Sequence, residues 1–203
     1  MPAVLTPRPR TLILLAKKRV PDLTTRIDKG EEPRVEYLEL AQQLGAELLD
    51  FHSVEASPLP TVRWISRRLG LCWGLALLGL LRRREFDHVY ATGEDVGIPL
   101  TMLLRVARCH EKLTMVVHNA GTPKRTKVLR ALGHRAYRHV ICLGSEQQRV
   151  LTQQIGLPAS KVKRFNQWCD HRFYRRREWR GLKGGRPDPH RRMSHLSSSK
   201  TRD

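Results

Sequence analysis

Short apolar runs alternate with amphipathic stretches along most of this chain, and this alternation is the feature that most restricts its fold. Because strands that alternate with helices favour a parallel sheet covered on both faces, we predict a Rossmann-like α/β domain with a parallel sheet and helices on both faces. The domain is expected to span residues 9–174. The predicted buried strands are 11–16, 47–51, 88–91, 113–117, 140–143 and 162–165.

The predicted helices lie between these runs and carry recognisable start and stop signals. A helix with apolar residues at Val35, Leu38, Ala41 and Leu44 is expected to stop at Gly45. Residues 53–60 are predicted as a loop and residues 62–83 as one long helix. Three further helices are expected, with these markers: Pro99 near the first turn of the first, Val128 to Ala136 in the second, and a capping box of Ser145 and Gln148 opening the third.

Polar residues follow the predicted strands where each strand ends. The carboxyl ends of parallel strands meet at one edge of a sheet, where ligands bind. The candidate site residues are Lys17, Arg19, Thr92, Gly93, Glu94, His118, Asn119, Ser145 and Glu146. We expect a polar ligand at this edge, with His118 as the candidate catalytic residue because it directly follows a strand. Each residue also has a structural interpretation: the serine as a helix cap, the glycines as turns, the histidine as a packing residue.

The sequence lacks the motifs of several common cofactor-binding and catalytic sites. The sequence has no G-x-G-x-x-G, no P-loop, no G-x-S-x-G and no H-E-x-x-H, which argues against a dinucleotide cofactor and the corresponding hydrolases. The four cysteines are widely separated and form no C-x-x-C pair. We therefore predict neither a metal site nor a disulfide framework, and interpret the cysteines as free thiols in a reducing, cytoplasmic compartment.

The charge of the chain favours anionic partners. The formal net charge is +19 and the sequence pI is about 10.8, a balance suited to nucleic acid, an acidic membrane surface or phosphorylated ligands.

Residues 69–81 are almost wholly apolar and lie between arginine clusters, with Trp64 and Trp73 nearby. This run is too short to span a bilayer. It is interpreted either as a buried core helix or as a surface helix that contacts anionic membrane peripherally, at the inner face.

Residues 164–180 mix arginines with aromatic side chains. This mixture can neutralise and stack single-stranded nucleic acid, so a basic nucleic-acid-binding protein is the alternative function. The competing interpretation is that the aromatics pack on the domain and the arginines are solvated. No RNA-binding signature accompanies the segment, which argues against a nucleic-acid partner.

The C-terminal segment has a different composition. Residues 172–203 carry eleven lysines and arginines against three acidic residues, and strongly apolar residues are rare. Such a composition buries too little surface to offset chain entropy. We predict a disordered basic tail over residues 175–203.

Ordered sequence pieces carry a family resemblance. They are LILLAKKRV, DKGEEPRVEYLELAQQLGAEL, FDHVYATGED, KLTMVVHNAGTPKR and HRAYRHVICLGSEQQRVLTQQIGLPASKVKRFNQWCDHRFY. Over residues 10–174 the chain resembles the N-terminal domain of family-4-like, retaining GT-B glycosyltransferases of bacterial type. The last piece is the most specific, since it is similar to the ending that leads into the family's second domain.

This resemblance implies a function and assigns residues. It implies hexosyl transfer from a nucleotide sugar to a glycan or lipid-linked acceptor, with no cofactor or metal. His118 would lie beside the transferred sugar, Ser145 and Glu146 match the residues after the fifth strand, and Asp170 matches the linker aspartate. Departures are Lys17 to Arg19 where the family often has glycines, and Gln-Trp-Cys-Asp in the linker.

The family's donor-binding domain has no counterpart in this sequence. The expectation is therefore an incomplete enzyme, truncated before that domain, which supplies the acceptor-side half and is inactive alone. A separate donor-binding domain or subunit would be its partner. An evolved basic arm is the alternative interpretation of the tail.

Overall fold

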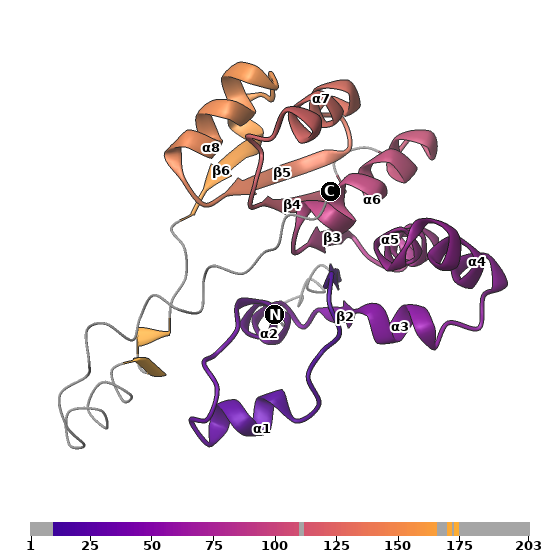
Figure 1. Cartoon of the computed structure of the whole chain (residues 1–203), viewed down its shortest axis with the longest axis vertical. Coiled ribbons are helices and arrows are strands. Elements are labelled where there is room, and N and C mark those ends of the chain that lie inside the picture. Colours follow the sequence, from indigo (N-terminus) through magenta and orange to yellow (C-terminus); the bar gives the residue numbers. More distant parts are fainter. Residues whose placement is uncertain (1–9, 110–111, 166–169, 172, 175–203) are drawn as a thin grey trace, which may run out of the picture. The chain divides into compact units, whose positions relative to one another are not determined.

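The computed structural model describes residues 10–109, 112–165, 170–171 and 173–174 (Figure 1). The chain divides into two compact units, one of residues 1–23 and 35–168 and the other of residues 24–34 and 169–203. The first unit contains the sheet.

Within the described residues, the sheet has six parallel strands in the order β2-β1-β3-β4-β5-β6. The strands are β1 (Thr11–Leu14), β2 (Glu47–Leu49), β3 (His88–Ala91), β4 (Leu113–Val117), β5 (Tyr137–Cys142) and β6 (Val162–Arg164). The chain passes from β1 to β2 on one side and then returns to place β3 on the other. β1 and β3 therefore flank the point where the strand order reverses, which is where open α/β sheets bind ligands. The prediction of a Rossmann-like parallel sheet is confirmed.

Helices cover both faces of this sheet. The bounds are α1 (Leu23–Asp28), α2 (Glu36–Leu44), α3 (Phe51–Glu55), α4 (Pro60–Leu69), α5 (Leu71–Arg82), α6 (Glu94–Val106), α7 (Pro123–Leu132), α8 (Ser145–Arg149), a π-helix (Val150–Gln154) and a 3₁₀ turn (Ala159–Lys161). On one face, Leu40 and Ala41 of α2 pack against Ile13, Tyr90 and Val116. On the other, α3 to α7 and the π-helix pack on the larger core, which includes Leu12, Val89 and Met115.

The helix predicted over residues 62–83 is two helices. Gly70 separates α4 from α5 with φ 98° and ψ 164°, a backbone conformation that is essentially restricted to glycine. The two helices pack against each other, which a single straight helix could not do. Within α5, Leu75, Ala76 and Leu78 are buried, so this helix is part of the core.

Three local predictions are wrong and one is confirmed. The loop predicted over 53–60 contains most of α3, because the carboxylate of Asp50 caps that helix. α6 begins at Glu94, so Pro99 lies inside the helix and not in its first turn. Ser145 is the first helical residue of α8 after the N-cap Gly144, and no side-chain capping bond forms. As predicted, α2 ends at Gly45, which has φ 59°.

Among the helices that the structure describes, none has the length and apolar character needed to cross a membrane.

The second unit is small in its described part. Within it, Arg34 is joined to Asp170: the main-chain N–H of Arg34 donates to the Asp170 carboxylate at 3.0 Å, and Nε of Arg34 donates to the same carboxylate at 3.4 Å. The N–H of Arg34, followed by its guanidinium, holds the pKa of Asp170 below its ordinary value despite burial. Residues 175–203, predicted as a disordered tail, lie outside the described residues, as do linker residues 166–169.

Candidate functional site

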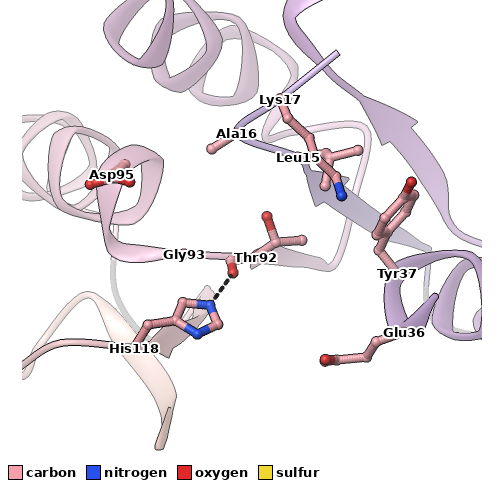
Figure 2. A pocket seen from close by; sticks show the side chains of 9 residues that line it. All are labelled: Leu15, Ala16, Lys17, Glu36, Tyr37, Thr92, Gly93, Asp95 and His118. Carbon is pink, nitrogen blue, oxygen red and sulfur yellow. Dashed lines mark hydrogen bonds between the residues drawn. The ribbon is translucent and has the colours of Figure 1, made fainter. Parts of the chain in front are cut away.

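An open pocket of about 300 Å³ lies where β1 and β3 end (Figure 2). Residues that follow β1, β3 and β4 form most of its wall, and the first turn of α2 forms the rest. The lining residues are Leu15, Ala16, Lys17, Glu36, Tyr37, Thr92, Gly93, Asp95 and His118. The structure therefore brings together four of the predicted site residues at the reversal point of the sheet. We call this pocket the crevice.

His118 has a defined ring orientation in the crevice. Its Nε2 lies 3.1 Å from the main-chain carbonyl oxygen of Thr92. Since a carbonyl only accepts hydrogen bonds, Nε2 carries the hydrogen in the neutral ring and Nδ1 is left as an acceptor. Figure 2 shows Nδ1 on the side of the ring that is turned away from Thr92. The ring can thus accept a hydrogen bond from a ligand hydroxyl.

Lys17 supplies the cation of the crevice. Its Nζ lies 4.9 Å from the centroid of the Tyr37 ring, a cation–π arrangement that keeps the ammonium group at the wall. Tyr37 is 7% exposed, and this burial raises the pKa of its hydroxyl. The ring is therefore a neutral wall and the lysine a fixed positive group.

Carboxylates stand on two sides of the crevice. Glu36 accepts a hydrogen bond from the hydroxyl of Tyr90 at 2.9 Å. Burial, followed by the charge of Glu36, raises the pKa of Tyr90 far above its ordinary range, so it remains a donor. Asp95, in the first turn of α6, is exposed and accepts from Arg125 Nη2 at 3.1 Å. Both acids keep oxygen atoms with which to accept ligand hydrogens.

Arg19 does not line the crevice. Its main-chain N–H and its Nε donate to the buried Asp50 carboxylate at 3.1 and 3.0 Å. The neighbouring Lys18 pairs with Glu55 at 2.7 Å. The three basic residues after β1 therefore have different roles: Lys17 faces the crevice, whereas Lys18 and Arg19 hold α3.

Glu94 is also absent from the wall, because it is only 4% exposed. Its carboxylate accepts the main-chain N–H groups of His118 and Asn119 at 2.9 and 3.0 Å, and pairs with Arg125. The Asn119 side chain is exposed beside this loop. These contacts make Glu94 a support for the loop that carries His118.

Ser145 and Glu146 lie at the exposed start of α8 and do not line the crevice. Glu146 pairs with Arg149 of the same helix at 2.6 Å. Gln147 makes the useful contact instead: its Nε2 donates to the main-chain carbonyl of His118, and its Oε1 accepts from Leu143 N at 3.0 Å. Sequence reasoning named the neighbours of Gln147 but missed this residue.

Glu36 and Tyr37 were missed as crevice residues. Asp95 directly follows Glu94, and the sequence does not show which of the two acids is buried. Glu36 and Tyr37 start a helix, so a rule based on strand ends could not find them. The sequence feature that could have identified Glu36 and Tyr37 is a pair of polar residues at the start of a helix that packs beside β1.

The described part of residues 164–180 bears on the nucleic-acid alternative. Phe165 and Tyr174 are 58% and 50% exposed, whereas Phe173 is 8% exposed and packs edge-on against Tyr174. Phe173 is therefore not available to stack on a base, whereas the exposed rings of Phe165 and Tyr174 are.

Within residues 10–109, 112–165 and the four described residues that follow, no three histidine, cysteine or acidic side chains are grouped to hold a metal ion. Cys72, Cys109 and Cys142 are free thiols.

No protein-family model, curated protein or solved structure matches this chain.

Proposed function

We propose that the crevice binds a sugar acceptor and that the domain is the acceptor-side half of a GT-B-type glycosyltransferase. The observation that carries the proposal is the placement of Lys17, Thr92, Gly93 and His118 in one pocket at the reversal point of the sheet. The resemblance of residues 10–174 to that enzyme family adds to it.

The charges around the crevice favour a neutral polyhydroxyl ligand over a phosphate. The N-terminus of α6 faces this edge, and helix N-termini attract anions. Here the first turn of α6 already places the carboxylate of Asp95 at the wall, and Glu36 adds a second carboxylate on the α2 side. A phosphate would meet these charges, whereas sugar hydroxyls can donate to Glu36 and Asp95 and accept from Lys17.

In the proposed reaction the oxygen of an acceptor hydroxyl forms a bond to the anomeric carbon of the nucleotide sugar, the bond from that carbon to the diphosphate breaks, and the nucleoside diphosphate and the hydroxyl proton are released. Lys17 and the carboxylates of Glu36 and Asp95 would orient the acceptor. Nδ1 of His118 would accept a hydrogen bond from an acceptor hydroxyl. The nucleotide sugar would be held by a donor-binding domain or subunit that faces this edge. Holding both reactants in register is the main contribution that such a cleft makes to the rate.

A glycan array tests acceptor binding without knowledge of the ligand. Labelled wild-type chain is compared with His118→Ala and Lys17→Ala, and with Lys163→Ala, which removes an exposed lysine of β6 away from the crevice. We expect the wild type and Lys163→Ala to share a set of bound glycans that both crevice variants lose. Binding of no glycan, or unchanged binding by the crevice variants, would contradict the proposal.

A second proposal concerns α4, which has the features of a surface that contacts anionic membrane. Trp64 and Leu69 are 60% and 54% exposed. The helix carries arginines at 63, 67 and 68 and no acidic residue. Basic side chains contribute about 1 kcal/mol each at an anionic surface, and an exposed tryptophan suits the interface.

Cosedimentation with vesicles tests this surface. We expect the chain to bind vesicles of phosphatidylglycerol and phosphatidylcholine but not phosphatidylcholine alone, with binding lost at high salt. Trp64→Ala should weaken binding, whereas Val106→Ala, which shortens an 85% exposed side chain on α6, should not. Equal loss in both variants, or no binding to either vesicle, would remove α4 as a membrane contact.

A further inference from the structure

The main chain of His118 is held from both sides by side chains of other elements. Its N–H donates to Oε2 of Glu94 at 2.9 Å, and its carbonyl accepts from Nε2 of Gln147. Glu94 is the first residue of α6 and Gln147 the third of α8. The residue after β4 is therefore fixed by two helices that flank it.

Both oxygen atoms of the Glu94 carboxylate accept hydrogen bonds in this arrangement. Its Oε1 accepts from Asn119 N at 3.0 Å and from Arg125, while Oε2 accepts from His118. Burial of a charged group at 4% exposure is costly unless it is paired and hydrogen-bonded, and these three donors satisfy it. A ligand in the crevice would find no free oxygen on Glu94, so this residue acts only through the loop it holds.

A fixed main chain determines what the His118 ring can do. With the loop held, Nε2 lies 3.1 Å from the Thr92 carbonyl oxygen, and this acceptor keeps the hydrogen on Nε2. If the loop shifts, the ring loses this acceptor and either nitrogen can carry the hydrogen. A ligand hydroxyl then meets an acceptor at Nδ1 for only part of the time.

We propose that Glu94, together with Gln147, is a positioning residue that keeps Nδ1 of His118 as a hydrogen-bond acceptor for a sugar hydroxyl. The identity of the ligand rests on the proposed function, whereas the state of the ring does not. Neither residue touches the ligand; both act through the main chain of His118.

The test reads the imidazole tautomer directly. Long-range ¹H–¹⁵N correlation spectra of uniformly labelled chain at pH 8 show which ring nitrogen carries the hydrogen, and the signals of His118 are identified from their loss in His118→Gln. The variants are Glu94→Gln and Gln147→Met. Glu146→Gln is the matched control, because it makes the same chemical change on an exposed carboxylate of α8.

We expect His118 to be in the Nε2–H form in the wild type and in Glu146→Gln, and to shift toward a mixture of tautomers in Glu94→Gln and Gln147→Met. Affinity for the best glycan of the array should fall about fivefold in both variants, the effect of one weakened hydrogen bond. If Glu94→Gln does not fold, Gln147→Met alone decides, since Gln147 is only half-buried. An Nε2–H form unchanged in the variants, or an Nδ1–H form in the wild type, would overturn the proposal. The expected tautomers without glycan binding would overturn only the sugar assignment.

Discussion

Replacement of Asp50 tests how the residues after β1 are held in place. Its side chain is fully buried and accepts from Ser53 N at 3.0 Å, which caps α3, and from Arg19 N and Nε at 3.1 and 3.0 Å. Burial alone would raise the pKa of Asp50, but the hydrogen bonds from Ser53 and Arg19 lower it from 3.8 to about 2. This depression corresponds to about 2 kcal/mol of stability.

Two substitutions separate the contributions. Asp50→Asn keeps an oxygen for the helix cap and loses the charge, so it should cost about 2 kcal/mol at pH 7. Asp50→Ala also removes the cap, which adds about 1 kcal/mol. Because the folded-state pKa is depressed, the stabilisation is present above pH 3.8 and is lost as the pH falls toward 2.

Urea unfolding followed by far-UV circular dichroism at pH 7, 5, 4 and 3 measures these differences. The gap between wild type and Asp50→Asn should shrink from pH 5 to pH 3, and Arg19→Gln should reproduce part of it at pH 7. If Asp50→Asn unfolds at the wild-type urea concentration at pH 7, or if the gap is independent of pH, the charge of the buried Asp50 carboxylate does not stabilise the fold.

Three further predictions concern packing, pH and activity. A Cβ at Gly97 of α6 would lie 2.3 Å from Sδ of Met115, so Gly97→Ala should lower stability by about 1–3 kcal/mol in a urea melt; the loss caused by Gly97→Ala should be smaller when it is made in a Met115→Ala background, and no loss in the single variant would contradict the close packing. Burial, followed by neighbouring cations, lowers the pKa of His88 below 6.5, so the stability of the fold should fall as the pH drops below 6.5 and the unfolded chain takes up a proton. Thermal melts at pH 5–8 should show a smaller fall in stability for His88→Gln than for the wild type, and equal falls would exclude this histidine as the cause. Purified chain incubated with UDP-glucose or GDP-mannose and a bound glycan should show no sugar transfer, because the proposal assigns donor binding to another domain; turnover above a heat-inactivated control would contradict it.

The centre of the sheet could be predicted because β1, β3 and β4 are buried almost throughout and are therefore mainly apolar runs. His88 to Ala91 and Leu113 to Val117 match the observed β3 and β4. The break at Gly70 could not be predicted, since apolar and helix-forming residues continue on both sides of it. Only the packing of α4 on α5 shows that the chain must turn there.

The candidate site was predictable where it depends on strand ends and not where it depends on burial. Lys17 and His118 were found because each follows a strand. Arg19 and Glu94 follow strands too, but their side chains turn to Asp50 and Arg125. Which of several neighbouring polar residues faces the ligand depends on tertiary ion pairs, and those join residues about 30 positions apart in the sequence.

Sugar binding in the crevice can be measured by a ¹H–¹⁵N correlation titration of labelled chain with methyl glycosides of glucose, mannose, galactose and N-acetylglucosamine at millimolar concentrations. The sugar-acceptor proposal predicts that at least one glycoside causes saturable shifts in the amide signals of Thr92, Gly93 and His118, and that these shifts disappear in His118→Ala. Shifts that cluster on α4 or at the opposite edge of the sheet, or no saturable shift with any glycoside, would contradict it.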